Sequence, residues 1–334
     1  KNFLIMEPKG RNKNPLAQSP GLGTLLKKLC AESSAVLLLM NVIPALTVLS
    51  CQREDLRVAE DTSGTESSDS TAIELSSVTI DYYTKCRLED IVIERLDIFI
   101  YGNEGTRSLL SHQSISEGLD LQGHLNLSFP GGGNGKAVTA VFIANCPKAL
   151  NIQALSRFDS MSILESNFAD DRPEAPLLTG SASVVPSGGP ESTSQIMLTP
   201  MLSRVILTAV TNGLSGYELL EDPQVLLHDI TPSAKVLQQE EFRPSETIES
   251  GKAQPLPCDV GFYTQYPNLS LYCYPNDTPE TTLGSPRTSL EFTCRIKGVE
   301  CSFPVELPPV ARNSIIRVEL TVNGVNDYSS TILE

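Results

Sequence analysis

Alternation of apolar and polar residues near the C-terminal end is the feature that most limits how this chain can fold. Between residues 289 and 322, apolar side chains occupy every second position in three successive runs. A period of two directs alternate side chains to opposite faces of a β-strand. One apolar face per strand is typical of sheets packed in a β-sandwich. The apolar positions are Leu290, Phe292, Cys294 and Ile296, then Cys301, Phe303, Val305 and Leu307, then Ile316, Val318, Leu320 and Val322.

Earlier segments extend this all-β prediction to most of the chain. Absence of Trp, together with 23 Pro and 22 Gly residues, also favours short strands and turns. The stretch 137–145 is apolar on both faces, as an interior strand should be. Residues 149–168 alone have a helical spacing, with Leu150, Leu155 and Phe158, and predict a short helix. The other predicted strands are residues 78–82, 96–101, 125–129, 177–185 and 195–211.

Composition divides the chain into four parts. Residues 1–50 form a signal region, and residues 51–71 are acidic and rich in Ser and Thr. Because this second part cannot bury enough apolar surface to become ordered, we predict a flexible tether. The remainder suits two domains of ordinary size, 72–212 and 213–334, with the boundary just after the strand that contains Arg204.

Cys51 is the predicted lipidation site. It follows an apolar run, residues 35–49, which a basic pair at 27–28 precedes. This order is typical of a secretory signal, and the run is shorter than the roughly 20 residues of a membrane span. The sequence Val48–Cys51 resembles the lipobox of bacterial lipoproteins, so we expect acylation and a stable outer-membrane anchor. A plain signal peptide cut near Ser50 and a buried core helix are the alternatives.

The charge balance argues against a nucleic-acid partner. The chain has 40 acidic and 25 basic residues and a net charge of −15, and no Lys/Arg-rich run follows the signal region. Nucleic-acid binding uses a basic surface, so we expect no nucleic-acid partner. In a chain of this charge, acidic pairs such as Asp170-Asp171 are typical of solvated faces.

The sequence contains no convincing motif for catalysis or cofactor binding. The glycine-rich stretch around Lys136 has Pro130 and Ala137 where a phosphate-binding loop needs Gly and Ser or Thr, so we interpret it as a hairpin loop. No Ser lies in a Gly-x-Ser-x-Gly elbow, and no His is near Cys146 in the sequence. CxxC is absent and the three His stand apart, which argues against a metal site. We therefore predict a protein that is not an enzyme and needs no cofactor.

Six cysteines follow Cys51, an even number that is compatible with disulfides in an exported chain. A hairpin centred on Lys297-Gly298 would place Cys294 opposite Cys301. With a two-residue turn, the two cysteines occupy a hydrogen-bonded site of the hairpin, where cross-strand disulfides fit poorly. With a four-residue turn, they occupy a non-hydrogen-bonded site, where the two strands are closer. We predict a contact, and a Cys294–Cys301 disulfide stays open.

Three stretches, taken in order, resemble the fimbrillin superfamily of Bacteroidales fimbriae. Ile93–Gly105 is similar to that family's early strand and turn. Leu198–Leu207, with a central Arg204, is similar to the strand that closes its first domain. Segments between Leu271 and Asn313, ending in Ala-Arg-Asn, are similar to its second domain, and the resemblance spans roughly residues 72–330.

The resemblance implies two transthyretin-like β-sandwich domains in tandem and assembly with other fimbrial subunits at the outer membrane. In such fimbriae, proteolysis after an Arg removes a subunit's first strand, and a neighbour's C-terminal segment fills the groove by β-augmentation. Arg87 follows the first predicted strand and is the candidate processing residue, whereas cleavage at Arg53 or Arg57 would remove the lipid anchor alone. The tail, residues 323–334, is short and polar, which favours an anchoring or terminal subunit.

A surface glycan-binding lipoprotein is the alternative. Sandwich proteins that bind sugars usually stack a ring on an exposed Trp, which this chain lacks. Its candidates are Tyr263, Tyr266, Tyr272 and Tyr274, and we interpret their clustering as strand and turn packing.

Overall fold

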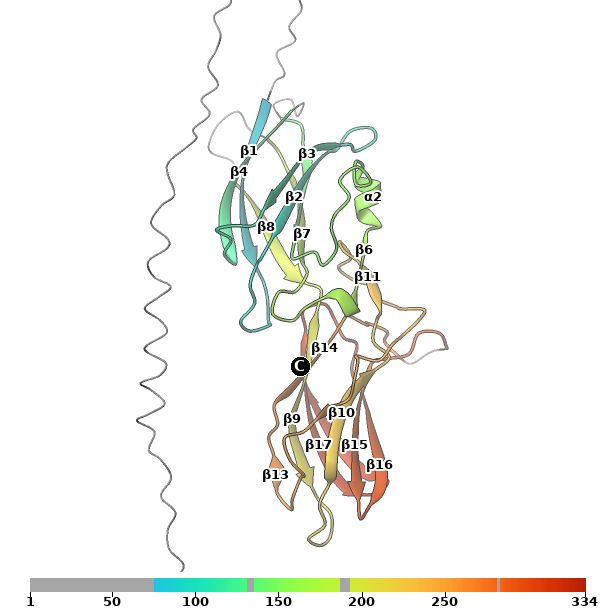
Figure 1. Cartoon of the computed structure of the whole chain (residues 1–334). Helices are drawn as coiled ribbons and strands as arrows, with labels where there is room; N and C mark the ends of the chain where they lie inside the picture. The colour runs from blue at the N-terminus through green and yellow to red at the C-terminus, as the bar shows by residue number, and fades with distance from the viewer. Residues whose placement is uncertain (1–74, 131–134, 187–192, 281–282) are drawn as a thin grey trace, which may run out of the picture. The chain divides into compact units, whose positions relative to one another are not determined.

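The structure is a computed structural model that describes residues 75–130, 135–186, 193–280 and 283–334. These residues belong to one compact unit, Asp69–Glu334. Their regular secondary structure is almost entirely β-strand (Figure 1). The all-β class predicted from the period of two is confirmed.

Seven strands form the first β-sandwich, in the order β3-β2-β5-β7-β8-β1-β4. Two residue pairs, Leu178 with Pro200 and Thr179 with Thr199, connect β7 to β8, and there the sheet folds over into two layers (Figure 1). The ring of Tyr82 on β1 meets the ring of Phe142 on β5 across the layers, with centroids 6.2 Å apart. The strands are β1 (Leu75–Thr84), β2 (Leu96–Gly102), β3 (Leu109–Ile115), β4 (Gln122–Pro130), β5 (Val138–Ala144), β7 (Leu178–Val184) and β8 (Thr193–Pro200).

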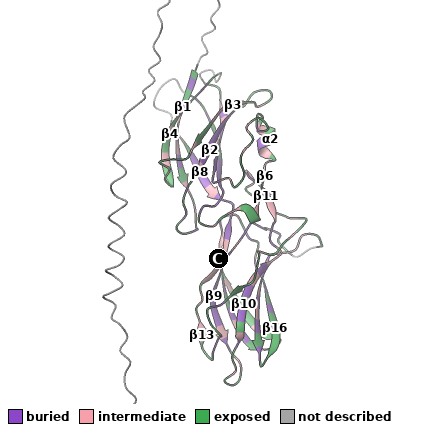
Figure 2. Ribbon diagram, in the orientation of Figure 1, coloured by how far each residue is buried: buried purple, intermediate pink, exposed green. Residues whose placement is uncertain are grey.

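The second sandwich packs the sheet β12-β10-β15-β16 against β13-β9-β17-β18, with β14 also paired to β9. Phe303 on β16 and Tyr328 on β18 meet edge to face at 5.4 Å. All of the alternating apolar side chains between 290 and 322 are buried here (Figure 2). The strands are β9 (Ser203–Asn212), β10 (Glu221–His228), β12 (Gln254–Pro255), β13 (Thr264–Gln265), β14 (Leu269–Cys273), β15 (Ser289–Ile296), β16 (Val299–Glu306), β17 (Ile315–Gly324) and β18 (Asp327–Leu333).

The two sandwiches are more interwoven than a boundary after β9 implies. β9 pairs with β17 and β14, and its Val205 lies in the second core. Val236 and Tyr274, from later in the chain, are buried in the first core. The short strands β6 (Glu165–Asn167) and β11 (Ser233–Lys235) also pair with each other. Alternation indicates that a segment is a strand but not which sheet receives it, so the sequence could not assign β9 correctly.

Residues 149–168 contain less helix than predicted. The helix α2 spans Phe158–Ser162, and a 3₁₀ turn, η1, spans Phe168–Asp170. Before α2, Asn151 Oδ1 accepts a hydrogen bond from the backbone N–H three residues later, at 3.2 Å, which favours a turn. Leu155 is buried without belonging to a helix. The apolar spacing of this stretch therefore reflects burial of individual residues, such as Leu155 in a turn, and not one face of a long helix.

Arg312, a half-buried cation in the turn before β17, joins the two sandwiches. Its Nη2 donates to Thr179 Oγ1 (2.7 Å) on β7 and to the Thr199 carbonyl (2.5 Å) on β8. Nε donates to the Pro200 carbonyl (3.0 Å), and Nη1 to the Gln238 carbonyl (2.7 Å). Burial lowers the pKa of Arg312 to about 10, so the guanidinium is still charged at neutral pH. One side chain thus satisfies four acceptors at the junction.

Replacing Arg312 by Lys should lower the free energy of unfolding by about 2 kcal/mol, because an ammonium cannot reach all the acceptors of the planar fork and leaves buried oxygens unpaired. Arg317→Lys, at an exposed position on β17, is the matched control and should change stability by less than about 0.5 kcal/mol. Urea unfolding followed by circular dichroism measures both. Equal losses in the two variants would contradict a joining role for Arg312.

Candidate functional site

The strand β1 has an interior place in its layer. It runs parallel to β8 on one side and antiparallel to β4 on the other. Its inward side chains, Val78, Ile80 and Tyr82, are at most 4% exposed. Withdrawal of such a strand would leave two unpaired edges above a row of apolar hollows. Removal of β1 would therefore create a groove able to bind another strand.

Arg87 lies in the loop that joins β1 to β2. Its side chain is exposed, while the next residue, Leu88, is 8% exposed and packs in the first core. A cut between them would separate β1 from the rest of the chain. The structure thus places the candidate processing residue on the surface directly after β1. Cys51, Arg53 and Arg57 lie outside the described residues.

The C-terminal strand, β18, lies at a sheet edge and pairs with β17. It has seven residues, and every one is at least partly exposed. Near its start, the Tyr328 hydroxyl donates to the Pro304 carbonyl at 2.5 Å. The tail that the sequence offers as a donor is therefore a short, mostly polar strand folded onto its own sandwich.

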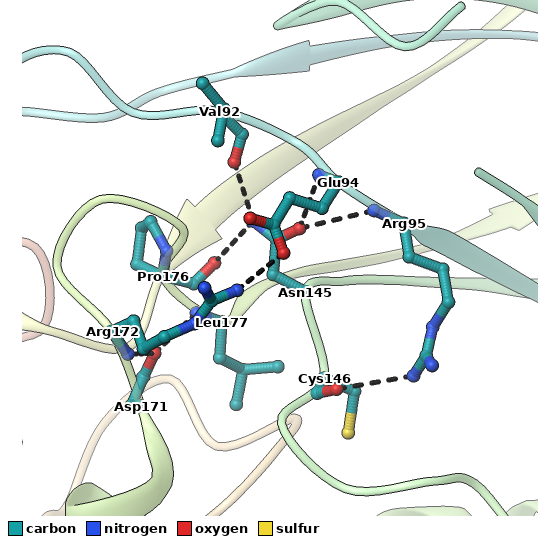
Figure 3. Close-up of polar contacts among 9 residues, drawn as sticks. All are labelled: Val92, Glu94, Arg95, Asn145, Cys146, Asp171, Arg172, Pro176 and Leu177. Atoms are coloured by element: carbon teal, nitrogen blue, oxygen red, sulfur yellow. Dashed lines mark hydrogen bonds and ion pairs between the residues drawn. The ribbon is translucent and has the colours of Figure 1, made fainter. Parts of the chain in front are cut away.

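A polar cavity of about 330 Å³ lies where β5 ends. Asn145 borders it, and its side chain accepts the N–H of Glu94 (2.8 Å) and donates to the Val92 carbonyl (2.7 Å) (Figure 3). Its φ of 55° is in the left-handed region, which Asn tolerates better than most residues. Glu94 also pairs with Arg172 at 2.5 Å. These groups pair with one another, which is the arrangement of a structural polar cluster.

Asp171 is the titrating group of this cavity. Its Oδ1 accepts the N–H groups of Arg172 and Leu177, each at 2.9 Å. Burial raises the pKa of Asp171 to about 6, and the hydrogen bonds offset only part of that effect. The sequence indicates a solvated acidic pair at 170–171, whereas the fold shields Asp171 where the chain turns toward β7.

The six described cysteines are free thiols in the structure. Cys294 lies opposite Cys301, across a turn at Lys297-Gly298 where both φ angles are positive, as in a two-residue type I′ turn. Burial raises the pKa of Cys294 to about 12 and also raises the pKa of Cys146. Since the thiolate is the reactive form, these shifts disfavour a nucleophilic role. The two residues are cross-strand partners, and a disulfide between them stays open.

Three exposed aromatic rings form a cluster on loops of the second sandwich. Tyr217, Phe262 and Tyr263 are 90%, 70% and 53% exposed. The Phe262 ring contacts the other two edge to face, at 5.9 and 6.2 Å. We call these three residues the aromatic cluster. The packing role predicted for the tyrosines fits the buried Tyr274 but not Tyr263 or the still more exposed Tyr266.

Other motifs give no further site. Among the described residues, no group of three His, Cys, Asp or Glu side chains is placed to hold a metal ion. No helix in the same part of the chain is long and apolar enough to cross a membrane. The glycine-rich stretch joins β4 to β5, and its residues 131–134 lie outside the described residues. β4 pairs with β1, whereas β5 pairs with β2 and β7. The stretch is a connection between layers rather than the predicted hairpin loop.

No protein-family model matches the chain, and no curated protein matches its sequence. Solved structures do match. A fimbrial assembly protein from Parabacteroides distasonis has a TM-score of 0.54 and 12% identity, covering 78% of this chain and 96% of its own. A fimbrilin from Porphyromonas gingivalis has a TM-score of 0.54 and 11% identity, covering 75% and 91%. The tip fimbrial protein Mfa3 from the same species, with a C-terminal truncation, has a TM-score of 0.50 and 9% identity, covering 77% and 99%.

The chain therefore has the fold of Bacteroidales fimbrillins and related fimbrial proteins. The matches span nearly the whole of each solved chain. At this low identity the fold is what the proteins demonstrably share. The fimbrillin-like fold that the three sequence stretches imply is thus confirmed.

Replacing Asp171 by Asn should stabilise the protein near pH 7, and the advantage should shrink toward pH 4. The folded-state pKa of about 6 lies above the ordinary 3.8, so the wild type loses stability as pH rises through this window. Asn does not titrate and can still accept both N–H groups. We expect a gain of about 1–3 kcal/mol at neutral pH. Thermal unfolding at both pH values measures it, and a pH-independent difference would contradict a buried, titrating Asp171.

Proposed function

We propose that this protein is a non-enzymatic subunit of a surface fimbria, exported as a lipoprotein through Cys51 and assembled by strand exchange. The fold that it shares with fimbrial proteins supports the fimbrial role. The observation that carries strand exchange is the place of β1. This strand is interior to its layer, lines the core and is followed by the exposed Arg87.

Where cleavage after Arg87 removes β1, a strand from another fimbrial subunit takes its place. Withdrawal of Val78, Ile80 and Tyr82 leaves hollows at every second position, so the donor needs apolar side chains with the same spacing. The backbone groups of β4 and β8 supply hydrogen bonds on both sides. Main-chain bonds then give affinity, and the hollows give register.

An anchoring or terminal position suits this chain best. A terminal subunit has a neighbour on one side only, so it does not need both a groove and a donor strand. The exposed, polar β18 offers few apolar side chains to a neighbour's groove. Acyl chains on Cys51 would hold the subunit at the outer membrane. A retained β1 would keep that anchor covalently attached to the first sandwich.

Intact mass and N-terminal sequencing of the protein from native outer membranes test this proposal. We expect a chain that begins at acylated Cys51 and retains β1. A chain that begins at Leu88 would contradict the anchoring position and indicate a polymerising subunit with an open groove. An unacylated N-terminus would contradict export as a lipoprotein.

The aromatic cluster favours a second candidate function, surface glycan binding. Its rings present apolar surface to solvent, against which the C–H groups of a sugar can pack. Glu218, the residue that follows Tyr217 in the chain, pairs with Lys297 at 2.6 Å. Exposed aromatic surface is the feature that supports sugar recognition here, even without Trp.

A glycan array, followed by calorimetry on the sugars that bind, tests this second function. Phe262→Ala should weaken binding by about tenfold or more, because Phe262 touches both other rings of the cluster. Tyr83→Ala removes an exposed ring from β1, in the first sandwich, and should leave affinity unchanged. Failure of the wild type to bind any sugar selectively would rule this function out.

A further inference from the structure

The second sandwich holds the chain at the bond where processing is proposed. We call Lys85–Leu88 the processing segment. Asn313, in the turn before β17, donates from Nδ2 to the Lys85 carbonyl at 2.8 Å, and its Oδ1 accepts the Arg87 N–H at 2.9 Å. Asn313 is 7% exposed. One buried amide therefore binds two main-chain groups of the processing segment.

These two groups lie on the edge that a protease would need. In an extended chain, residues i and i+2 direct their N–H and C=O groups to the same side. A protease that binds its substrate as an added strand pairs with such an edge. Here Asn313 occupies both the Lys85 carbonyl and the Arg87 N–H. The Arg87 side chain is accessible, but the backbone beside it is not.

Two further contacts hold the processing segment on the first sandwich. The Lys85 N–H donates to the Leu198 carbonyl on β8 at 2.9 Å. Leu88, on the far side of the bond, is buried. Cleavage after Arg87 thus requires local opening, and its rate depends on the population of the opened segment.

We propose that Asn313 controls proteolysis at Arg87, so that the bond is protected while the turn at 311–314 is docked and is cut when that turn is displaced. The inference rests on the proposed processing position. Arg312, the preceding residue, holds the same turn against β7 and β8. The second sandwich thereby determines whether the first keeps its own strand.

Replacing Asn313 by Gly tests the proposal without straining the turn. Asn313 has a φ of 58°, which Gly adopts freely, so the variant loses the amide but not the backbone conformation. The full mature protein is treated with an arginine-specific endoprotease, and the product that begins at Leu88 is quantified by mass spectrometry. We expect cleavage there to accelerate at least about fivefold, because two hydrogen bonds no longer oppose opening. Asn313→Asp keeps an acceptor for the Arg87 N–H but loses the donor to the Lys85 carbonyl. Its rate of cleavage after Arg87 should therefore lie between the rates of the wild type and Asn313→Gly.

Asn276→Ala is the matched control. Asn276 is also a buried amide of the second sandwich, and its Nδ2 donates to the carbonyls of Asp229 and Pro286. The rate at Arg87 is divided by the rate at the protein's other arginines, so that general unfolding cancels. This ratio should rise in Asn313→Gly and stay at the wild-type value in Asn276→Ala, and an unchanged ratio in Asn313→Gly would overturn the proposal. The ratio is measured on isolated protein, so it stands whichever residue begins the native chain.

Discussion

Main-chain pairing of β1 is the constraint on which the first sandwich depends. In the described sheet, β8 and β4 are connected through β1. Without it the layer is broken, and the space filled by Ile80 opens to water. Buried peptide groups and apolar surface are costly to expose, so the position must be filled by this strand or by an equivalent one. The place of β1 is thus the part of this fold that is most costly to leave empty.

Two neighbouring side chains extend this constraint to the second sandwich. Arg312 binds the ends of β7 and β8, and Asn313 binds the chain where it leaves β1. The cores are also interwoven, because Tyr274 is buried in the first core while β9 belongs to the second. The two sandwiches accordingly belong to one compact unit.

Local patterns were readable from the sequence, and long-range contacts were not. Alternation located β15, β16 and β17 because each has one buried face. Arg87 could be placed after the first strand because both features are local. Asn313 and its partner Arg87 are 226 residues apart, and no spacing rule links them. The aromatic cluster likewise needs two separate loops, those of Tyr217 and Phe262, to be brought together by folding.

The mixed pairing of β1 has a consequence for geometry beyond a single subunit. A strand that replaces β1 and keeps both sets of hydrogen bonds must run in the same direction, from the Leu75 end to the Thr84 end. Each such junction joins two unlike surfaces, and junctions of that kind build an open filament when the rotation between successive subunits does not close a ring. The direction of one strand in its sheet would therefore give a whole fibre two different ends.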